Sequence, residues 1–550
     1  MNAAILFQPD GYLLNVQTLM GRQSAGNGFL RAAVAAAGTE TLRAYTPQSR
    51  SAAAFAAAVA ELDPKVKTAT IAGGRLDLLA EAGVLYRPDG VLWPHARARL
   101  RMGSAAYSLC GVTHTLSTHG TLDVIGRMIT EPIMPWDALV CTSTAALSVV
   151  NTVLESQAEF LRWRLGQEPP STRPMLPVIP LGVHCQDFAF SAADRAAARA
   201  AMGLKPDDVA ALFAGRLSVS GKSHPHAMFL ALQRAAEQTG KPVVLVMAGR
   251  AATDAMADLF YAGLAEVCPD VRPVFVDGKD MAAYRAAWAG SDLFISLADS
   301  VQETFGITPL EAMASGLPAL VTDWNGYKDT VRDGLDGFRI RTWAPPPGAG
   351  IAIAVAYESN SLTYESYLSR SNTAVTVDIA ELTERLCDLV RDPELRRRLG
   401  AAGQARARAE FDWAIVFRRY QALWDEQTAV RRAAAADPKT AAWLAAAPGK
   451  GSDHLGPFDT FATYPTLHVG VGTLVAHNAH VTKAAYRELI AQDANALWKV
   501  SAEVADRLMD ALAAGPLSVG DLAAATGLEP MLAIEIVTRL AKIDVLTLTT

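Results

Sequence analysis

The chain has 550 residues, which is too many for one ordinary domain core and predicts several domains. Hydrophobic residues make up 51% and charged residues 19% of the chain, and these proportions exclude a protein dominated by disorder. The formal net charge of −6 gives no overall attraction to nucleic acid, so we expect no nucleic-acid partner.

The cysteines and the N-terminal residues indicate in which cellular compartment the protein works. The five cysteines include no C-x-x-C pair, and their odd number argues against a disulfide framework. The start, MNAAILFQPDGYLL, has no basic region before a long apolar run, and no stretch reaches about 18 uninterrupted apolar residues. We therefore expect no signal peptide and no membrane span. The protein is expected to be cytoplasmic, working either free or at the inner face of the membrane.

Short apolar runs alternate with alanine-rich segments of helical period from the N-terminus onward. AAILFQ, TLRAY and KTATIAG are separated by NGFLRAAVAAAG and AAAFAAAVAEL, which is typical of β/α units around a parallel sheet. The rhythm continues to PVIPLGV and restarts at AALFAGR, followed by VVLVMAGR, VRPVFVDG, DLFISLA and PALVTDW. The sequence therefore predicts an α/β protein with two doubly wound, Rossmann-like domains in series.

The other boundaries follow from changes in composition. A loop and a Ser/Tyr-rich segment between Trp343 and Asn372 break the rhythm, and we expect a surface insertion there. The expected parts are 1–184 for the first domain, 185–410 for the second, 411–427 for an aromatic-rich helix that returns to the first domain, 428–500 for a linker and accessory segment, and 501–550 for a small C-terminal domain.

The last 50 residues carry three helical segments and a strand-like end, which predict a winged-helix-like fold. A DNA reader needs a basic face. This segment instead holds three Lys and Arg residues against seven Asp and Glu residues, a net charge of −4. A contact module for a second copy of the chain or for another protein is therefore favoured.

The strongest chemical signal is DLFISLADSVQETFGITPLEAMASGLPALVTDW. A strand ends near Leu297, a loop carries Glu303, and a helix starts near Pro309. The backbone N–H groups of residues 305–308 would point out of the helix start, where a diphosphate is favourably bound. The residues concerned are Phe305, Gly306, Ile307 and Thr308.

Two carboxylates in this segment are candidate sugar-nucleotide ligands. Glu311 lies about one turn inside the helix, where it can accept hydrogen bonds from two ribose hydroxyls, and Glu303 can accept hydroxyls of the sugar. Two cations in LFAGRLSVSGKSHP complement them. Arg216 and Lys222 follow a strand and can neutralise the phosphates of a leaving diphosphate in place of a metal ion.

These motifs resemble the retaining glycosyltransferases of family 4, or group 1. The resemblance rests on the E-x7-E pair, on EAMASGLP, and on DWNGYKDTVRDGLDGF with Gly326 and Gly337, and it is most specific from Ser291 to Phe338. It implies the GT-B fold, with an acceptor-binding first domain and a donor-binding second domain facing each other across a cleft. It also assigns Arg216 and Lys222 to the donor diphosphate.

The resemblance assigns further contacts. His114 in CGVTHTLSTHG would contact the transferred sugar, with His119 as the competing choice. Gly28, in a glycine-bearing loop before a helix, would approach the donor phosphates or the acceptor. Val276, Asp277 and Gly278 would contact the nucleobase through their backbone.

A basic cluster in the first domain has two interpretations. It could meet anionic lipid or a phosphorylated acceptor, or it could be an ordinary solvated face, which is the favoured reading. Its members are Arg87, Arg97, Arg99 and Arg101. No His, Cys, Asp and Glu cluster has metal-ligand spacing, so we expect no metal and no other cofactor.

The sequence thus predicts a retaining, metal-independent enzyme that moves a hexose from a UDP- or GDP-sugar to a hydroxyl. The acceptor would be a glycan, a lipid-linked compound or a protein, in surface glycan, lipopolysaccharide or glycoprotein assembly. The alternatives are a nucleotide-sugar epimerase, hydrolase or phosphorylase of the same fold, or a scaffold protein that works through its C-terminal domain.

Overall fold

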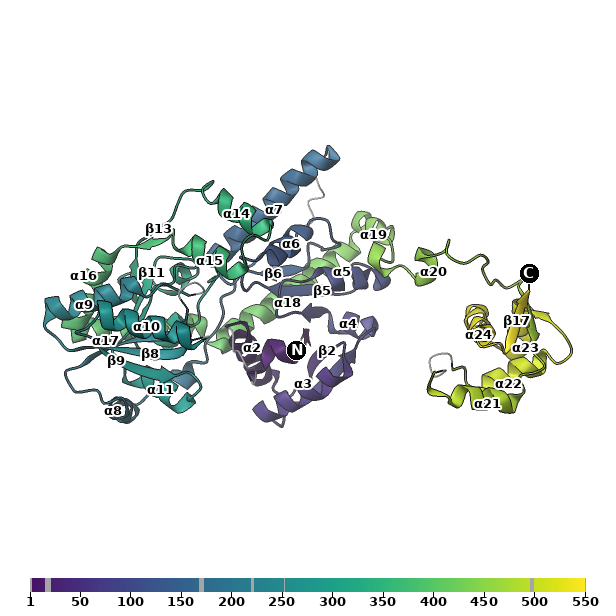
Figure 1. Ribbon diagram of the computed structural model, residues 1–550, viewed down its shortest axis with the longest axis horizontal. Coiled ribbons are helices and arrows are strands. Elements are labelled where there is room, and N and C mark those ends of the chain that lie inside the picture. The colour runs from purple at the N-terminus through teal and green to yellow at the C-terminus, as the bar shows by residue number, and fades with distance from the viewer. Residues whose placement is uncertain are drawn as a thin grey trace. The chain divides into compact units, whose positions relative to one another are not determined.

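The computed structural model in Figure 1 describes residues 2–14, 21–167, 173–218, 222–251, 253–494 and 499–549. The chain divides into two compact units, Met1–His454 and Leu455–Thr550. The first unit contains both Rossmann-like domains that the sequence predicts. None of the described helices has both the length and the apolar character that a membrane crossing requires.

The first domain is built on a six-stranded parallel sheet in the order β3-β2-β1-β4-β5-β6, which is the Rossmann order. Its strands are β1 (Ala4–Leu6), β2 (Leu42–Thr46), β3 (Thr68–Ala72), β4 (Val84–Tyr86), β5 (Ser108–Val112) and β6 (Ala138–Val140). Its helices are α1 (Pro9–Tyr12), α2 (Gly21–Ala37), α3 (Ser49–Leu62), α4 (Leu76–Ala82), α5 (Trp93–Arg99), α6 (His119–Arg127) and α7 (Thr144–Leu165).

The second domain repeats this plan with the order β12-β11-β10-β7-β8-β9. Its strands are β7 (Val209–Leu217), β8 (Val243–Ala251), β9 (Arg272–Asp277), β10 (Leu293–Ser296), β11 (Ala319–Thr322) and β12 (Gly337–Ile340). Its helices include α8 (Ala192–Ala201), α9 (His226–Thr239), α10 (Asp254–Val267), α11 (Met281–Gly290), α12 (Thr308–Ala314), α13 (Tyr327–Thr330), α16 (Ile379–Arg391) and α17 (Pro393–Arg406). The predicted α/β fold class, with two Rossmann-like domains, is confirmed.

Both sheets are buried on both faces, as parallel sheets are. Successive residues of a strand point to opposite faces, so Ile5 and Leu6 of β1 belong to two different core clusters of the first domain. Leu245 and Val246 of β8 divide in the same way in the second domain. This two-sided burial explains why the strands read as continuous apolar runs in the sequence.

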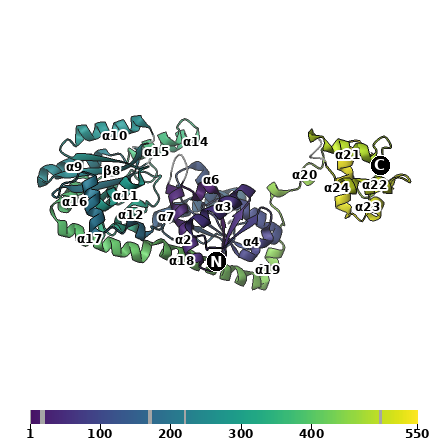
Figure 2. The ribbon, with the colours of Figure 1, turned by 90° about the horizontal axis from the view of Figure 1, so that it is seen from below.

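A long helix, α18 (Trp413–Ala436), returns the chain to the first domain. Its aromatic side chains, among them Phe417 and Trp424, are buried in the first domain's core, as the sequence predicts. The helix continues beyond residue 427, where the prediction ended it. Arg431 explains the extension, because its side chain is buried and its guanidinium donates to the carbonyls of Ala105 and Ala106 in the first domain. Figure 2 shows α17 and α18 following one another along one side of the unit, and α19 (Pro438–Ala445) comes next.

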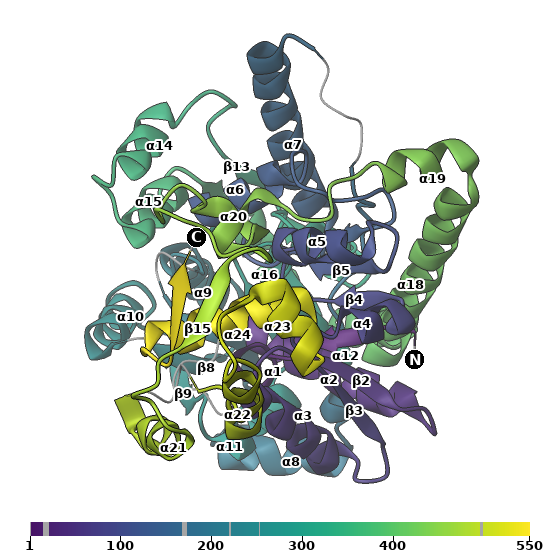
Figure 3. The ribbon, with the colours of Figure 1, turned by 90° about the vertical axis from the view of Figure 1, so that its right-hand side faces the viewer.

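The insertion predicted between Trp343 and Asn372 carries regular structure. It is framed by the short antiparallel pair β13 (Thr342–Trp343) and β14 (Thr376–Val377) and contains α14 (Ile351–Glu358) and α15 (Tyr364–Asn372). Figure 3 shows both helices near α6 of the first domain.

The C-terminal unit starts earlier than residue 501. Its antiparallel sheet has the order β16-β15-β17, and the middle strand comes from the segment that the sequence assigned to a linker. Val475 of that strand and Tyr486 of α21 complete the unit's core, which residues 501–550 alone would leave open. The described elements are α20 (Pro457–Thr460), β15 (Leu474–His477), α21 (Lys483–Ala491), α22 (Ala502–Ala511), β16 (Leu517–Ser518), α23 (Val519–Thr526), α24 (Pro530–Lys542) and β17 (Leu546–Thr549). The winged-helix-like assignment stays a prediction.

Candidate active site

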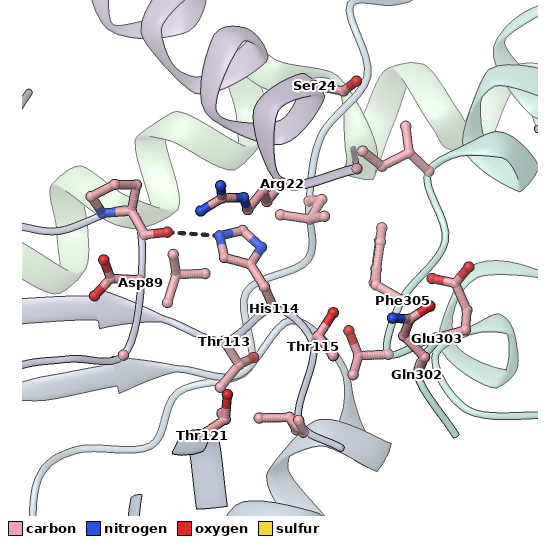
Figure 4. Close-up of a pocket in the computed structure, with 18 of the residues that line it drawn as sticks. Arg22, Ser24, Asp89, Thr113, His114, Thr115, Thr121, Gln302, Glu303 and Phe305 are labelled. Carbon is pink, nitrogen blue, oxygen red and sulfur yellow. Dashed lines mark hydrogen bonds between the residues drawn. The ribbon is translucent and has the colours of Figure 1, made fainter. Parts of the chain in front are cut away.

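A cavity of about 730 Å³ lies in the first unit and is lined by both of its Rossmann-like domains. The lining residues follow the carboxyl ends of β1, β4 and β5 in one domain and of β7 and β10 in the other, the edge where α/β sheets bind ligands. We call the lining residues between Gln8 and Leu181 the first-domain wall, and those between Gly215 and Glu311 the second-domain wall. Figure 4 shows parts of both walls facing each other.

The loop between β10 and α12 forms much of the second-domain wall. Phe305, Gly306, Ile307 and Thr308, the residues that the sequence assigned to the diphosphate, all line the cavity. Gly306 has a positive φ of 80°, and a Cβ there would lie 2.2 Å from the ring of Tyr327. Only glycine therefore fits at this turn.

An ion pair joins the two predicted donor ligands Lys222 and Glu303. The Lys222 Nζ and the Glu303 Oε2 lie 2.7 Å apart, with 12% and 19% of the two side chains exposed. Burial works to raise the pKa of Glu303, but the charge of Lys222 and its hydrogen bond outweigh burial and lower that pKa. Burial likewise opposes the charge of Lys222, and Glu303 overcomes it and raises the Lys222 pKa. Both groups are therefore charged at neutral pH.

Glu311 lies in the same wall, and within the described residues it forms no ion pair. Its Oε2 is buried and accepts no hydrogen bond within the described part of the chain. Burial raises the pKa of this carboxyl to about 7, although the charge of Lys222 works in the opposite direction. A buried acceptor without a donor is costly, so this oxygen is suited to a hydroxyl that a ligand brings.

Arg216 stands at the end of β7, on the exposed side of the wall. Its guanidinium donates to the side-chain carbonyl of Gln302 at 3.4 Å. Among the described residues no carboxylate forms a salt bridge with it, so its charge is available to a ligand.

The structure separates the two candidate histidines. His114 lines the cavity, and its Nε2 donates to the Pro88 carbonyl at 2.8 Å. Burial lowers the His114 pKa, so the ring is neutral and its Nδ1 can accept a hydrogen bond. Figure 4 shows this second nitrogen turned into the cavity. His119 lies outside the lining and packs against Tyr357 of the insertion, with the ring centroids 4.0 Å apart.

Gly28 does not have the position that the sequence predicted. It lies inside α2 and not in a loop before it, and it is not a lining residue. A Cβ at this position would lie 2.3 Å from the indole nitrogen of Trp413, so the glycine lets α18 pack against α2. Helix packing therefore explains this residue.

The predicted nucleobase loop also lies outside the cavity lining. Val276 and Asp277 end β9, and Gly278 begins the turn after it. The Asp277 carboxylate accepts a hydrogen bond from the Lys279 backbone at 2.9 Å, which holds the turn. Contact between this loop and a base stays a prediction.

The DWNGY element supports the donor loop from behind, a role that sequence reasoning missed. The Trp324 indole donates to the Ser300 carbonyl at 3.0 Å, and the Asn325 amide donates to the Glu303 carbonyl at 2.8 Å. The Tyr327 hydroxyl lies 2.9 Å from the Ser296 hydroxyl and accepts from Lys222 at 3.4 Å. The motif itself was the available signal, but it did not say which side chain reaches Lys222.

Three of the four members of the predicted basic cluster form ion pairs. Arg97 pairs with Glu131 at 2.6 Å, and the fully buried Arg99 pairs with Asp137 at the same distance. Arg87 pairs with Asp89 at 2.9 Å. These three charges are therefore neutralised within the fold, and they do not form a patch for anionic lipid.

The insertion contacts both Rossmann-like domains. The Tyr364 hydroxyl lies 2.7 Å from the Ser117 hydroxyl of the first domain and accepts from the Gln302 amide at 3.2 Å. In the described ranges no group of three or more His, Cys, Asp or Glu side chains is arranged to hold a metal ion.

Parts of the chain are similar to known proteins. Residues 194–343 match the family model described as Glycosyl transferases group 1. The chain is 25% identical over 328 residues to an alpha-maltose-1-phosphate synthase of Mycobacterium tuberculosis, covering 57% of this chain and 73% of that protein. It is 29% identical over 188 residues to a D-inositol 3-phosphate glycosyltransferase of Nocardia farcinica, covering 32% and 40%. A crystal structure of Anabaena Alr3699/HepE in complex with UDP has a TM-score of 0.49 at 15% identity, covering 78% of this chain and 100% of that one.

Proposed function

We propose that this chain, a glycosyltransferase of the group 1 type, moves a hexose from a nucleoside-diphosphate sugar to an acceptor hydroxyl with retention of configuration and without a metal ion. The observation that carries the proposal is the second-domain wall. There two cations, Arg216 and Lys222, and a carboxyl with an unpartnered buried oxygen, Glu311, converge on one cavity.

Each of these groups matches one part of a nucleotide sugar. Glu311 would accept hydrogen bonds from ribose hydroxyls through the oxygen that lacks a donor. Lys222 and Arg216 would offset the charge that develops on the diphosphate as it leaves, which is the work of a divalent cation in other transferases. Glu303 would hold hydroxyls of the sugar, and it also keeps Lys222 in place through their ion pair.

The transfer step needs no nucleophilic side chain. The bond between the anomeric carbon and the diphosphate oxygen breaks, and the acceptor oxygen forms the new bond on the same face of the sugar. The acceptor proton passes to the departing diphosphate. His114, neutral and presenting Nδ1 to the cavity, would accept a hydrogen bond from a sugar hydroxyl and orient the ring.

Binding experiments with nucleotide sugars test whether this cavity holds such a donor. We expect one UDP- or GDP-sugar to raise the melting temperature of the chain in a thermal-shift screen, because a ligand that binds only the folded state stabilises it. Calorimetry with that compound should show at least about tenfold weaker binding to Glu311→Ala. Unchanged binding to this variant would sink the donor-site assignment.

The reaction type needs a second experiment. The chain is incubated with that donor and a panel of acceptors, with and without a chelator, and the products are followed by NMR. We expect an α-linked product from an α-linked donor, at a rate that the chelator leaves unchanged. Epimerised free donor would replace the transferase proposal with an epimerase, and a sugar phosphate formed only with inorganic phosphate would replace it with a phosphorylase. The setting in surface glycan, lipopolysaccharide or glycoprotein assembly stays a prediction.

A further inference from the structure

The charges on the first-domain wall bear on the acceptor. Within the described lining of this wall, Arg22 is the one cation, and Asp10 and Asp89 are the carboxylates, which gives a net charge of −1. Residues 15–20 fall outside the described ranges, and their sequence, NVQTLM, contains no charged side chain. No further cation can therefore come from that segment.

Arg22, the cation of this described lining, already forms an ion pair with a carboxylate. The Arg22 guanidinium donates to the Asp10 carboxylate at 2.7 Å. A phosphate beside Arg22 would compete with Asp10 for the guanidinium and would lie next to a carboxylate of its own sign. Water screens these partly exposed groups, but like charges brought together at a binding surface still select against such a ligand relative to a neutral one.

The second carboxylate is held firmly in its charged form. Asp89 receives two hydrogen bonds from Arg87, at 3.0 and 2.9 Å, and one from the Val91 backbone at 2.8 Å. Burial works against its charge, but these bonds prevail and keep the Asp89 pKa low. The charge of Arg87 is neutralised by Asp89, and Arg87 does not line the cavity.

The rest of the wall offers uncharged hydrogen-bonding groups. Hydroxyl-bearing side chains gather where β5 ends and α6 begins, and Figure 4 shows Thr113, Thr115 and Thr121 around the cavity together with His114. Thr118 belongs to the same group. Hydroxyls that both donate and accept, beside carboxylates that only accept, complement a ligand rich in hydroxyl groups.

We propose that the acceptor is an uncharged polyhydroxyl compound, a sugar or the terminus of a glycan, and that this wall rejects sugar phosphates. The inference rests on the proposed transferase function and specifies its acceptor class. Asp10 and Asp89 would receive acceptor hydroxyls, and Arg22 would hold Asp10 in position.

The test compares acceptors that differ only by a phosphate. The wild-type chain is supplied with its best donor and with glucose or glucose 1-phosphate, and then with inositol or inositol 3-phosphate, and the transfer product is measured by mass spectrometry. We expect kcat/KM to be at least about tenfold higher for the neutral member of a pair. Preference for the phosphorylated members overturns the inference. Failure of the proposed function would instead appear as absence of donor binding, or as donor that is consumed or epimerised without transfer to either member of any pair.

A charge variant sharpens the test. Asp10→Asn removes the partner of Arg22 and leaves the cation free, so the ratio of phosphorylated to neutral acceptor use should rise at least about fivefold. Asp77→Asn is the matched control, because it removes the carboxylate of the exposed Arg75–Asp77 pair in the same domain, away from the cavity lining. An unchanged ratio in Asp10→Asn, equal to that of the control, would contradict the role given to this wall.

Discussion

The two walls of the cavity hold similar numbers of ionisable groups and use them differently. The second-domain wall carries Arg216 and Lys222 against Glu303 and a Glu311 whose pKa is raised to about 7. Burial therefore favours the neutral form of Glu311, and Arg216 has no salt-bridge partner in the described residues. This wall can therefore receive a diphosphate.

The first-domain wall is the opposite case. Arg22, the one cation in its described lining, is paired with Asp10, and Asp89 adds a second carboxylate. This contrast is the basis of the proposal that the cavity takes a charged donor on one side and a neutral acceptor on the other. The predictions below test this division of charge, beginning with the group on which it depends most.

The largest effect is expected from removing Lys222. Lys222→Met takes away the cation nearest Glu303 and should lower kcat by about a hundredfold to a thousandfold, the usual cost of losing one charge-stabilising group. It also leaves Glu303 unpaired in a largely buried site, which should destabilise the fold by about 3–5 kcal/mol.

A double variant separates these two losses. Adding Glu303→Gln removes the unpaired charge, so urea denaturation should show most of the stability restored while kcat stays low. Lys279→Met, at the turn after β9 and outside the cavity lining, serves as the control for loss of a lysine. Recovery of activity in the double variant would mean that Lys222 acts only on the fold.

The second prediction uses the raised pKa of Glu311. The carboxylate form accepts ribose hydroxyls best, so donor affinity measured by calorimetry should rise as the pH increases through about 7. Glu311→Gln should bind about tenfold more weakly at pH 8 and should lose this pH dependence. A variant that keeps the wild-type pH profile would show that another group titrates.

Without donor, the stability of the fold should decrease as the pH rises, whereas donor affinity increases. The Glu311 pKa lies above its ordinary value of 4.5, so its contribution to folding is complete below that pH and is lost as the pH rises through about 7. The melting temperature should therefore fall between pH 5 and 8, and fall less in Glu311→Gln. Asp299, whose pKa burial also raises to about 7, keeps part of the slope in the variant.

The third prediction concerns the hydroxyl behind the ion pair. Tyr327→Phe removes the group that links Ser296 to Lys222 and should lower kcat about fivefold with little change in KM, because Lys222 loses a positioning contact. Tyr486→Phe is the control, since its hydroxyl donates to the Val500 carbonyl at 2.7 Å in the other unit. A positioning role for Tyr327 is supported if the two variants lose the same melting temperature and only Tyr327→Phe loses kcat. Unchanged kcat in Tyr327→Phe would contradict it.

The two walls also differ in how far the sequence predicts them. The second-domain wall comes from one continuous stretch and one strand end, so motif spacing was enough to bring Glu303, Glu311, Lys222 and Arg216 to one cavity. The α/β alternation was equally readable, because strands buried on both faces leave apolar runs at regular intervals. Motif spacing does not predict the Lys222–Glu303 contact, because side-chain pairing depends on the tertiary fold.

The first-domain wall is assembled from loops after three strands, and no local pattern connects Asp10, Arg22 and Asp89. Sequence reasoning found only His114 there, and it placed Gly28 in a loop when the residue lies inside a helix. The same limit explains the C-terminal unit. Strand β15 joins its sheet by pairing with β17, about 70 residues further on, and such long-range pairing leaves no local signal.

The smallest effect is expected where the walls are joined. The Tyr364 hydroxyl contacts Ser117 of the first domain and Gln302 of the donor loop, so Tyr364→Phe should weaken the connection without changing the charge of either wall. We expect KM for the donor to rise about two- to threefold with kcat nearly constant, because one neutral hydrogen bond contributes about 1 kcal/mol or less. Tyr367→Phe on the same helix, where the ring stacks on Tyr357, controls for the loss of a hydroxyl. A tenfold fall in kcat for Tyr364→Phe would mean that the insertion takes part in the transfer step, and the division of labour between the two walls would then have to include a third element.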